Sequence, residues 1–202
     1  MSYWRRISLV KLLCIAAVVL LQCSNAYGVV DSITTGLWGV INGSTPHETG
    51  VGIYGGTAYD WSRMSFCQAN IQWLYKYSDV CSHNTPDRAK MKFEFNIGAA
   101  EGSDFPGQRV MVSGNILSVY EFDSLKNTKI VPYIEGGVGL IYADFQRPDQ
   151  GLRFNFNPVA GMGLRFGSKY IVVRAHHISN GGTNDNNRGV NSIVLGFGAF
   201  LD

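Results

Sequence analysis

Charged residues are scarce in this chain of 202 residues, since Asp, Glu, Lys and Arg together make up only 16%. An ordinary soluble domain carries about 25%. Glycine, by contrast, occurs 24 times, and aromatic residues make up 12%. The shortage of charge argues against an ordinary soluble domain. The glycine and aromatic content suits short strands with close backbone approaches better than a helical bundle.

The motifs of common metal and cofactor sites are also missing. The sequence contains no Cys-x-x-Cys, no His-Glu-x-x-His and no phosphate-binding loop. Gly50–Gly55 matches the letters of a dinucleotide-binding fingerprint, but it lacks the preceding strand and the following helix on which that site depends. Close packing within a strand explains these glycines better.

The apolar run Leu12–Leu21 is too short to span a bilayer as a helix. It follows Arg5, Arg6 and Lys11 and precedes the small-x-small sequence Ser24-Asn25-Ala26, so we predict that residues 1–26 are a secretory signal peptide. Its removal leaves 14 basic and 15 acidic residues, a formal charge of −1. This balance does not indicate a nucleic-acid partner.

Two other export signals are weaker. Cys23 resembles a lipoprotein site, but the preceding Gln22 is bulky for that position, and Arg5-Arg6 also fits a twin-arginine signal. After the signal peptide, residues 27–49 show no clear period, and we assign them to an N-terminal periplasmic segment. Within it, Asp31 is suited to cap a short helix over residues 32–42.

From Gly50 onward, the sequence alternates strands with turn-forming clusters. We predict eight strands, near 50–60, 66–77, 89–100, 109–121, 129–143, 152–166, 169–179 and 190–201. In the sixth, apolar residues from Leu152 to Phe166 alternate with polar or very small ones. Such alternation fits both a soluble sandwich and a membrane barrel. The signal peptide, the even strand count and the strand length of about ten residues favour an all-β, eight-stranded antiparallel outer-membrane β-barrel over residues 50–202.

Side chains fill the interior of an eight-stranded barrel, so we expect no pore. The charged residues predicted to face the lumen should form a structural polar core: Glu94, Glu135, Arg153, Arg165 and Arg174. Cys67 and Cys81 form an even pair in an oxidising compartment. The strand assignment nevertheless separates them by about 33 Å, whereas bonded cysteines need Cα atoms within about 7 Å. We therefore predict no disulfide.

The last two strands carry polar residues where they approach each other across a loop. In a strand over 170–179, His177 and Ser179 share the face of the apolar residues, and His176 points to the lumen. Asn191 begins the next strand on its apolar face. With the N-terminus in the periplasm, this loop lies outside the cell, and the three side chains meet at the outer rim. Polar strand ends cost little at that depth, so periodicity alone also allows a non-catalytic explanation.

The order His-x-Ser-Asn-x-Gly at 177–182, with an Asn-initiated strand about a dozen residues later, resembles the lipid A deacylase family of the PagL type. The resemblance implies an outer-membrane esterase that removes the 3-linked hydroxyacyl chain of lipid A in lipopolysaccharide, without a metal or other cofactor. It also implies that Ser179 is the nucleophile and His177 the general base. Asn180 and the backbone N–H of Gly182 would then stabilise the oxyanion.

One position departs from that family pattern. Its best-known member carries Glu where the spacing from His177 places Asn191, so the acidic third residue is missing here. An Asn can orient a histidine, as in Cys-His-Asn proteases, but it has no charge to stabilise an imidazolium. We therefore predict a Ser179-His177-Asn191 triad, in an enzyme that is either slower than one with an acidic third residue or uses a substitute acid. Asp185, in the intervening loop, is the nearest candidate for that acid.

Two other functions stay open at this point. The barrel could be a non-catalytic structural or adhesion module, in which case replacing Ser179 has no effect beyond stability. It could also be a phospholipase with the same surface site. The residues do not decide which acyl chain is removed, nor whether a homodimer forms through the lipid-facing surface.

Overall fold

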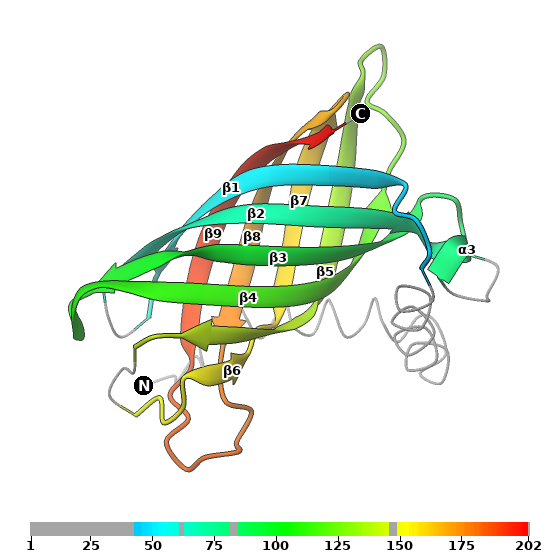
Figure 1. Cartoon of the computed structure of the whole chain (residues 1–202). Helices are drawn as coiled ribbons and strands as arrows, with labels where there is room; N and C mark the ends of the chain where they lie inside the picture. Colours follow the sequence, from blue (N-terminus) through cyan, green and yellow to red (C-terminus); the bar gives the residue numbers. More distant parts are fainter. Residues whose placement is uncertain (1–42, 61–62, 81–84, 146–148, 202) are drawn as a thin grey trace, which may run out of the picture.

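The computed structural model describes residues 43–60, 63–80, 85–145 and 149–201 (Figure 1). These residues form nine strands and one short helix, in the order β1 (Glu48–Ala58), β2 (Met64–Lys76), α3 (Tyr77–Val80), β3 (Ala89–Gly102), β4 (Phe105–Glu121), β5 (Ile130–Ala143), β6 (Phe154–Phe156), β7 (Val159–Phe166), β8 (Lys169–Ile178) and β9 (Val190–Leu201). The predicted signal peptide and the predicted helix over 32–42 lie outside the described residues. Glu48 and Thr49, assigned above to the N-terminal segment, already belong to β1.

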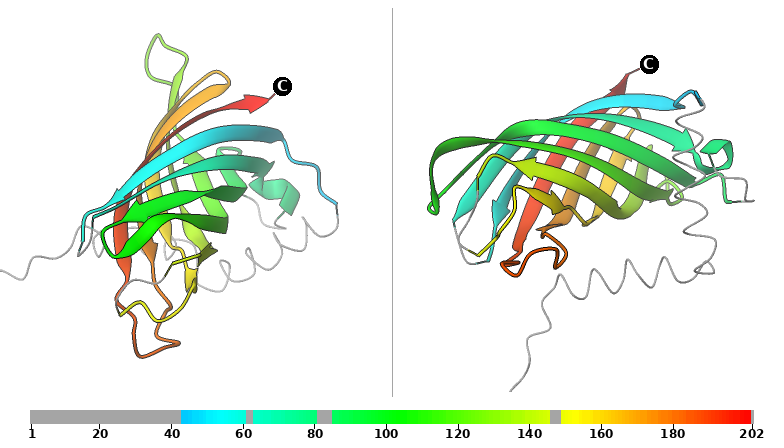
Figure 2. Two further views of the ribbon diagram at one scale, coloured as in Figure 1. Left: turned by 60° about the vertical axis from the view of Figure 1, so that its left-hand side comes forward. Right: turned by 60° about the horizontal axis from the view of Figure 1, so that its bottom comes forward.

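All strands belong to one antiparallel sheet that closes on itself (Figure 2). The first and last strands pair, with Gly52 opposite Gly198, and β4 pairs with β5 to complete the ring. Both β6 and β7 pair with β5, so they are two parts of one barrel strand. The predicted eight-stranded barrel is therefore confirmed.

The sixth barrel strand is interrupted where the sequence predicted continuity over 152–166. Pro158 lies at the break and has no N–H to donate to the sheet. Its carbonyl still accepts the His177 N–H at 3.0 Å, and the Asn157 N–H donates to Gly139 O at 2.8 Å. The break leaves β6 free to pair separately with the residues that follow β8.

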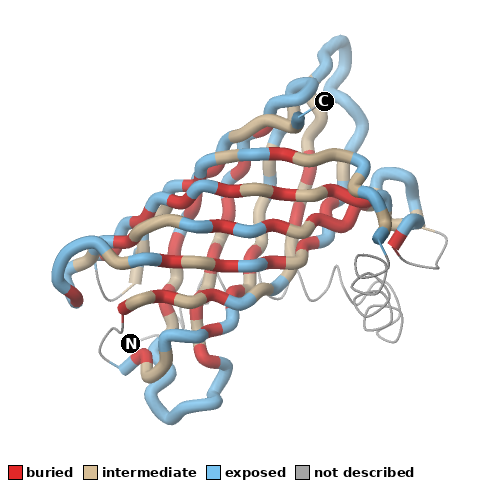
Figure 3. The backbone as a smooth tube through the Cα atoms, viewed as in Figure 1, coloured by how far each residue is buried: buried red, intermediate tan, exposed pale blue. Residues whose placement is uncertain are grey.

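Buried and exposed residues alternate along the strands (Figure 3). Large apolar side chains that are more than half exposed lie near the middle of strands all around the barrel, among them Ile53, Ile97, Val138, Met162 and Phe197. In water such a surface would be costly, whereas in a bilayer it is the expected outer belt. The alternation that the sequence predicted is thus present. Among the described residues, no helix is long and apolar enough to span a membrane.

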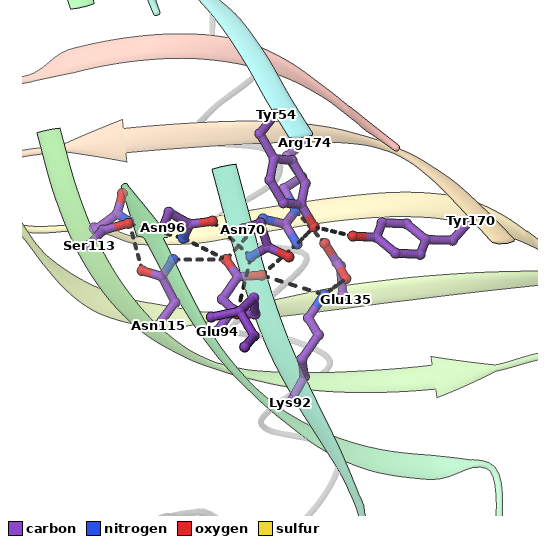
Figure 4. A network of polar contacts seen from close by, with 12 residues as sticks. Tyr54, Asn70, Lys92, Glu94, Asn96, Ser113, Asn115, Glu135, Tyr170 and Arg174 are labelled. Atoms are coloured by element: carbon purple, nitrogen blue, oxygen red, sulfur yellow. Dashed lines mark hydrogen bonds and ion pairs between the residues drawn. The ribbon is translucent and has the colours of Figure 1, made fainter. Parts of the chain in front are cut away.

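A network of buried charges occupies part of the lumen (Figure 4). Arg174 donates from both terminal nitrogens to Glu94, each at 2.9 Å, and from Nε to Glu135. Lys92 pairs with Glu135, and the Tyr54 hydroxyl accepts from Arg174 at 3.1 Å. Each buried charge therefore has a partner of opposite sign, which agrees with the predicted structural polar core.

The other two arginines assigned to that core differ: Arg165 lines the lumen together with Glu135, whereas Arg153 does not. Arg165 is at the opposite end of the barrel from the β8–β9 loop, where it pairs with Glu48 and Glu121. Arg153 precedes β6, and its half-exposed side chain pairs with Asp144 at 3.0 Å. The prediction for Arg153 was wrong because this residue stands at the outer end of the β5–β6 pairing, where its carbonyl accepts the Ala143 N–H at 3.0 Å and its side chain is exposed.

Four connections gather at one end of the barrel: β1–β2, β3–β4, β5–β6 and β8–β9 (Figures 1 and 2). In the predicted orientation this is the outer end. Fully buried apolar side chains fill the lumen beneath these loops, namely Met64, Met111, Ile141, Ile178 and Val190. This packing fixes the ends of β8 and β9 that carry the candidate site.

The disulfide prediction stays untested. Cys67, near the outer end of β2, is exposed. Cys81 lies outside the described residues.

Candidate active site

Pairing of β8 with β9 places His177 directly opposite Asn191. Both side chains are half-buried on the outer face, next to the apolar belt. His177 Nδ1 lies 2.7 Å from Asn191 Oδ1, a hydrogen-bond distance. One residue earlier, His176 points into the lumen, as predicted, where its Nδ1 lies 3.1 Å from Ser192 Oγ. The two histidines thus face opposite sides of one strand.

Asn191 is held in turn by Asp60, which follows the end of β1. The Asn191 backbone N–H lies 3.0 and 2.9 Å from the two carboxylate oxygens, and Nδ2 donates to Oδ2 at 2.6 Å. Sequence reasoning missed this residue, which is 131 positions away from Asn191. It named Asp185 instead, and that side chain is exposed in the β8–β9 loop with no hydrogen bond to His177 or Asn191 in the described part of the chain.

These contacts fix the direction of every hydrogen bond in the series. An ionised carboxylate only accepts, so Asn191 must turn its NH₂ group toward Asp60 and its oxygen toward His177. His177 Nδ1 is then the donor. In the neutral imidazole this leaves Nε2 without a hydrogen, which is the state that a general base requires.

Gly189 provides the space in which the His177 ring lies. A Cβ at this position would stand 2.6 Å from His177 Cε1 and 3.1 Å from Nε2. Any side chain here would therefore displace the imidazole. The sequence offered no signal for this role, because Gly189 belongs to a polar loop and its contact depends on how that loop folds back.

Ser179 continues the outer face of β8, two residues beyond His177. Its backbone forms an isolated antiparallel bridge with Phe156 of β6, with N–H···O distances of 2.7 and 3.1 Å. The intervening Ile178 is fully buried. Among the described residues, no hydrogen bond joins the Ser179 hydroxyl to His177. Ser179 and His177 thus lie on one face of β8 without a hydrogen bond between them. Such a gap does not argue against catalysis, because catalytic hydrogen bonds often form only once substrate binds.

Asn180 and Gly182, the predicted oxyanion stabilisers, are engaged with each other. Gly181 and Gly182 have φ of +65° and +85°, and this left-handed turn lets the Gly182 N–H donate to Asn180 Oδ1 at 2.9 Å. Asn180 is 1% exposed, and its Nδ2 donates to loop carbonyls, with Asn186 O at 2.8 Å. Both predicted donors are therefore occupied within the β8–β9 loop.

No metal-binding arrangement is present in the part of the chain that the structure describes. A group of at least three His, Cys, Asp or Glu side chains that could hold a metal ion does not occur there. The candidate site is thus composed of Ser179, His177, Asn191 and Asp60, with Gly189 beneath the imidazole.

Comparison with known families shows to which of them the chain belongs. The sequence model of the lipid A 3-O-deacylase (PagL) family matches residues 53–199, which is most of the barrel and includes the entire β8–β9 motif. The chain belongs to the lipid A 3-O-deacylase (PagL) family. The resemblance inferred from the motif is confirmed, and membership of this lipid A deacylase family, with the apolar belt around the barrel, confirms the outer membrane as its location.

One solved structure supports the same fold. The crystal structure of the outer membrane enzyme PagL is similar with a TM-score of 0.58 and 23% sequence identity, covering 74% of this chain and 98% of that chain. Weaker matches are Neisserial surface protein A (TM-score 0.47, 12% identity, 76% and 94% coverage) and a de novo designed transmembrane β-barrel (TM-score 0.44, 11% identity, 78% and 98% coverage). No curated protein sequence matches the chain.

Proposed function

We propose that this protein is a serine esterase that hydrolyses the 3-linked hydroxyacyl ester of lipid A. Ser179 is the nucleophile, His177 the general base and Asn191 the residue that orients His177. One observation carries the proposal: in a chain of the lipid A deacylase family, His177 is held by Asn191 on the same outer face as Ser179. Its bare Nε2 is then free to take the hydroxyl proton.

The reaction divides into two acyl transfers. Ser179 Oγ attacks the ester carbonyl while its proton passes to His177 Nε2. The tetrahedral intermediate collapses, the sugar oxygen leaves with the proton from His177, and the acyl chain remains on Ser179. Water then repeats the sequence, giving up a proton to His177 and releasing the hydroxy fatty acid. The protein returns to its starting state, and no other reactant is consumed.

The place of the site on the barrel suits this substrate. His177 and Asn191 stand where the apolar outer faces of β8 and β9 end, beyond Val173, Ile193 and Leu195. A lipid A molecule in the outer leaflet has its acyl chains along the apolar belt and its ester bonds at the boundary with the headgroup. A serine on the outer face can therefore reach the ester without extracting the lipid from the membrane.

Oxyanion stabilisation by Asn180 and Gly182 remains part of the proposal and requires a local change. The Gly182 N–H must leave Asn180 Oδ1, and Asn180 Nδ2 must leave its carbonyl partners, before either can donate to an oxyanion. The loop residues around them are exposed, and the two glycines allow backbone rotation. Substrate binding is the event that we expect to reorganise this turn.

The test is mass spectrometry of lipid A after incubation with the refolded barrel in detergent, with phospholipid offered in parallel. Native protein should remove one hydroxyacyl chain from lipid A, and Ser179→Ala should remove none. Ser192→Ala is the matched control, because Ser192 is on the adjacent strand but faces the lumen beside His176; it should retain activity. Cleavage of phospholipid alone would assign a phospholipase, and unchanged lipids with folded native protein would indicate a non-catalytic barrel.

A further inference from the structure

We propose that Asp60 is a positioning residue that turns Asn191 toward His177 and supplies the negative charge that this site otherwise lacks. The inference rests on the proposed function, since it concerns the general base of the same reaction. Asp60 would not touch the substrate. It would act through Asn191, and the site would therefore operate as a series of Ser179, His177, Asn191 and Asp60.

The contacts show what Asp60 does to Asn191. A side-chain amide can present either its oxygen or its nitrogen to a neighbour. If Nδ2 faced His177, Nδ1 would have to accept and the ring proton would lie on Nε2, where it blocks proton transfer from Ser179. The Asp60 carboxylate removes that possibility, because Nδ2 is bound to it at 2.6 Å. Only the productive tautomer of His177 then satisfies the hydrogen bonds.

Asp60 supplies a negative charge near Asn191, the position at which the acidic residue of the family pattern is missing. Proton transfer from Ser179 creates an imidazolium, which a neutral amide alone does not balance. Asp60 binds that amide on the side away from His177. Its carboxylate polarises the hydrogen bond that Asn191 Oδ1 accepts from His177. Within the described residues, no other carboxylate forms a hydrogen bond or ion pair with His177 or Asn191.

A purely structural role for Asp60 accounts poorly for these contacts. β1 and β9 are already joined by pairing from Thr49 opposite Leu201 to Ala58 opposite Ser192. The Tyr59 N–H extends this pairing by donating to Asn191 O at 3.1 Å. A carboxylate is not needed to close the barrel at this point, yet all three hydrogen bonds that Asp60 accepts from the described residues come from Asn191.

An exchange of the two side chains tests the inference. In Asp60→Asn, the new amide would accept the Asn191 backbone N–H and turn its own NH₂ toward Asn191 Oδ1, which reverses Asn191 and protonates His177 on Nε2. We expect kcat to fall at least about 10-fold, since a positioned general base contributes about 10²–10⁴-fold and the wrong tautomer costs about 10⁴-fold in a serine protease. KM should change little, because Asp60 does not contact lipid.

Asn191→Asp alone should also lower kcat, since it sets two carboxylates against each other. The double variant Asp60→Asn with Asn191→Asp restores the side-chain hydrogen bond between the two positions with its direction reversed, keeps one acceptor for the residue 191 N–H, and moves the charge next to His177. It should therefore recover kcat to at least the native value. Asp185→Asn, the same change in an exposed loop residue, should have no effect. Folding of each variant is checked by heat-modifiable gel migration.

Two results would overturn the inference: a kcat of Asp60→Asn within twofold of native, or a double variant as impaired as the product of the two single variants. If native protein cleaves no lipid A, the proposed function fails, and Asp60 is then judged from the ¹⁵N NMR shifts of the His177 ring in detergent. Native protein should carry the proton on Nδ1 and Asp60→Asn on Nε2. The same tautomer in both proteins would refute the role of Asp60 independently of activity.

Discussion

Replacing Gly189 with alanine should inactivate the site while leaving the barrel intact. The new Cβ would stand 2.6 Å from His177 Cε1, which is 0.8 Å short of the 3.4 Å at which ordinary contact begins. It would also stand 3.0 Å from Ile178 O, so the alanine itself has little room to retreat. The imidazole, at the free end of a side chain, is the group that must move.

The size of this movement sets the expected effect. A displacement of about 1 Å of a catalytic group can cost about 10²-fold in rate, so we expect Gly189→Ala to lower kcat for lipid A by about that factor. The unfolding temperature should change little, because moving a half-exposed ring end disturbs no buried packing. Release of the hydroxy fatty acid over time, measured by mass spectrometry, gives the rate.

Gly114→Ala is the matched control for this substitution. Gly114 lies on the outer face of β4, and a Cβ there would meet no atom within 4 Å. It should retain native activity. A Gly189→Ala protein as active as Gly114→Ala would show that the position of the His177 ring over Gly189 is not the catalytic one, and the reasoning would be refuted.

Two predictions concern the barrel. Arg174→Met leaves Glu94 and Glu135 buried with only Lys92 to balance them. We therefore expect the free energy of unfolding, measured in urea titrations, to fall by about 3–5 kcal/mol, while the folded fraction still cleaves lipid A. An unchanged midpoint of the urea titration would contradict this prediction. Met162→Arg places a charge on the apolar belt and should lower the free energy of unfolding in lipid vesicles by about 2–4 kcal/mol. The control Met162→Leu should lower it by less than about 1.5 kcal/mol. Equal stabilities of the two variants would place Met162 outside the hydrocarbon region.

Most of the fold follows from the period-two alternation of the sequence. A residue's face depends only on its position along a strand, so the alternation alone assigns Glu94, Glu135 and Arg174 to the lumen and His177 to the outer face. The same reasoning failed at Arg153 and at Pro158. Arg153 is exposed because it stands at the outer end of the β5–β6 pairing, and Pro158 interrupts the strand because it has no N–H to donate, although the alternation of faces continues past it.

The site was only partly predictable, because its residues come from distant parts of the chain. His177, Ser179 and Asn191 lie within 15 residues of one another, and the strand pattern places them together. Asp60 joins them only because β1 closes the barrel against β9 in one particular register. That register results from packing around the entire ring, and no local pattern near Asp60 encodes it. The turn that occupies Asn180 and Gly182 is held by contacts within the β8–β9 loop and by one donor contact from Asn180 to Gln150 O in the β5–β6 loop.

The most direct test of the account is detection of the acyl group on Ser179. Native protein is mixed with lipid A, quenched within the first turnover and digested, and the peptide that carries residues 177–182 is analysed by fragmentation mass spectrometry. The account predicts a mass increase of one hydroxyacyl group on Ser179 that disappears on longer incubation and is absent from His177→Ala. Deacylation of lipid A by Ser179→Ala, or an acyl group on another residue of the native protein, would contradict it.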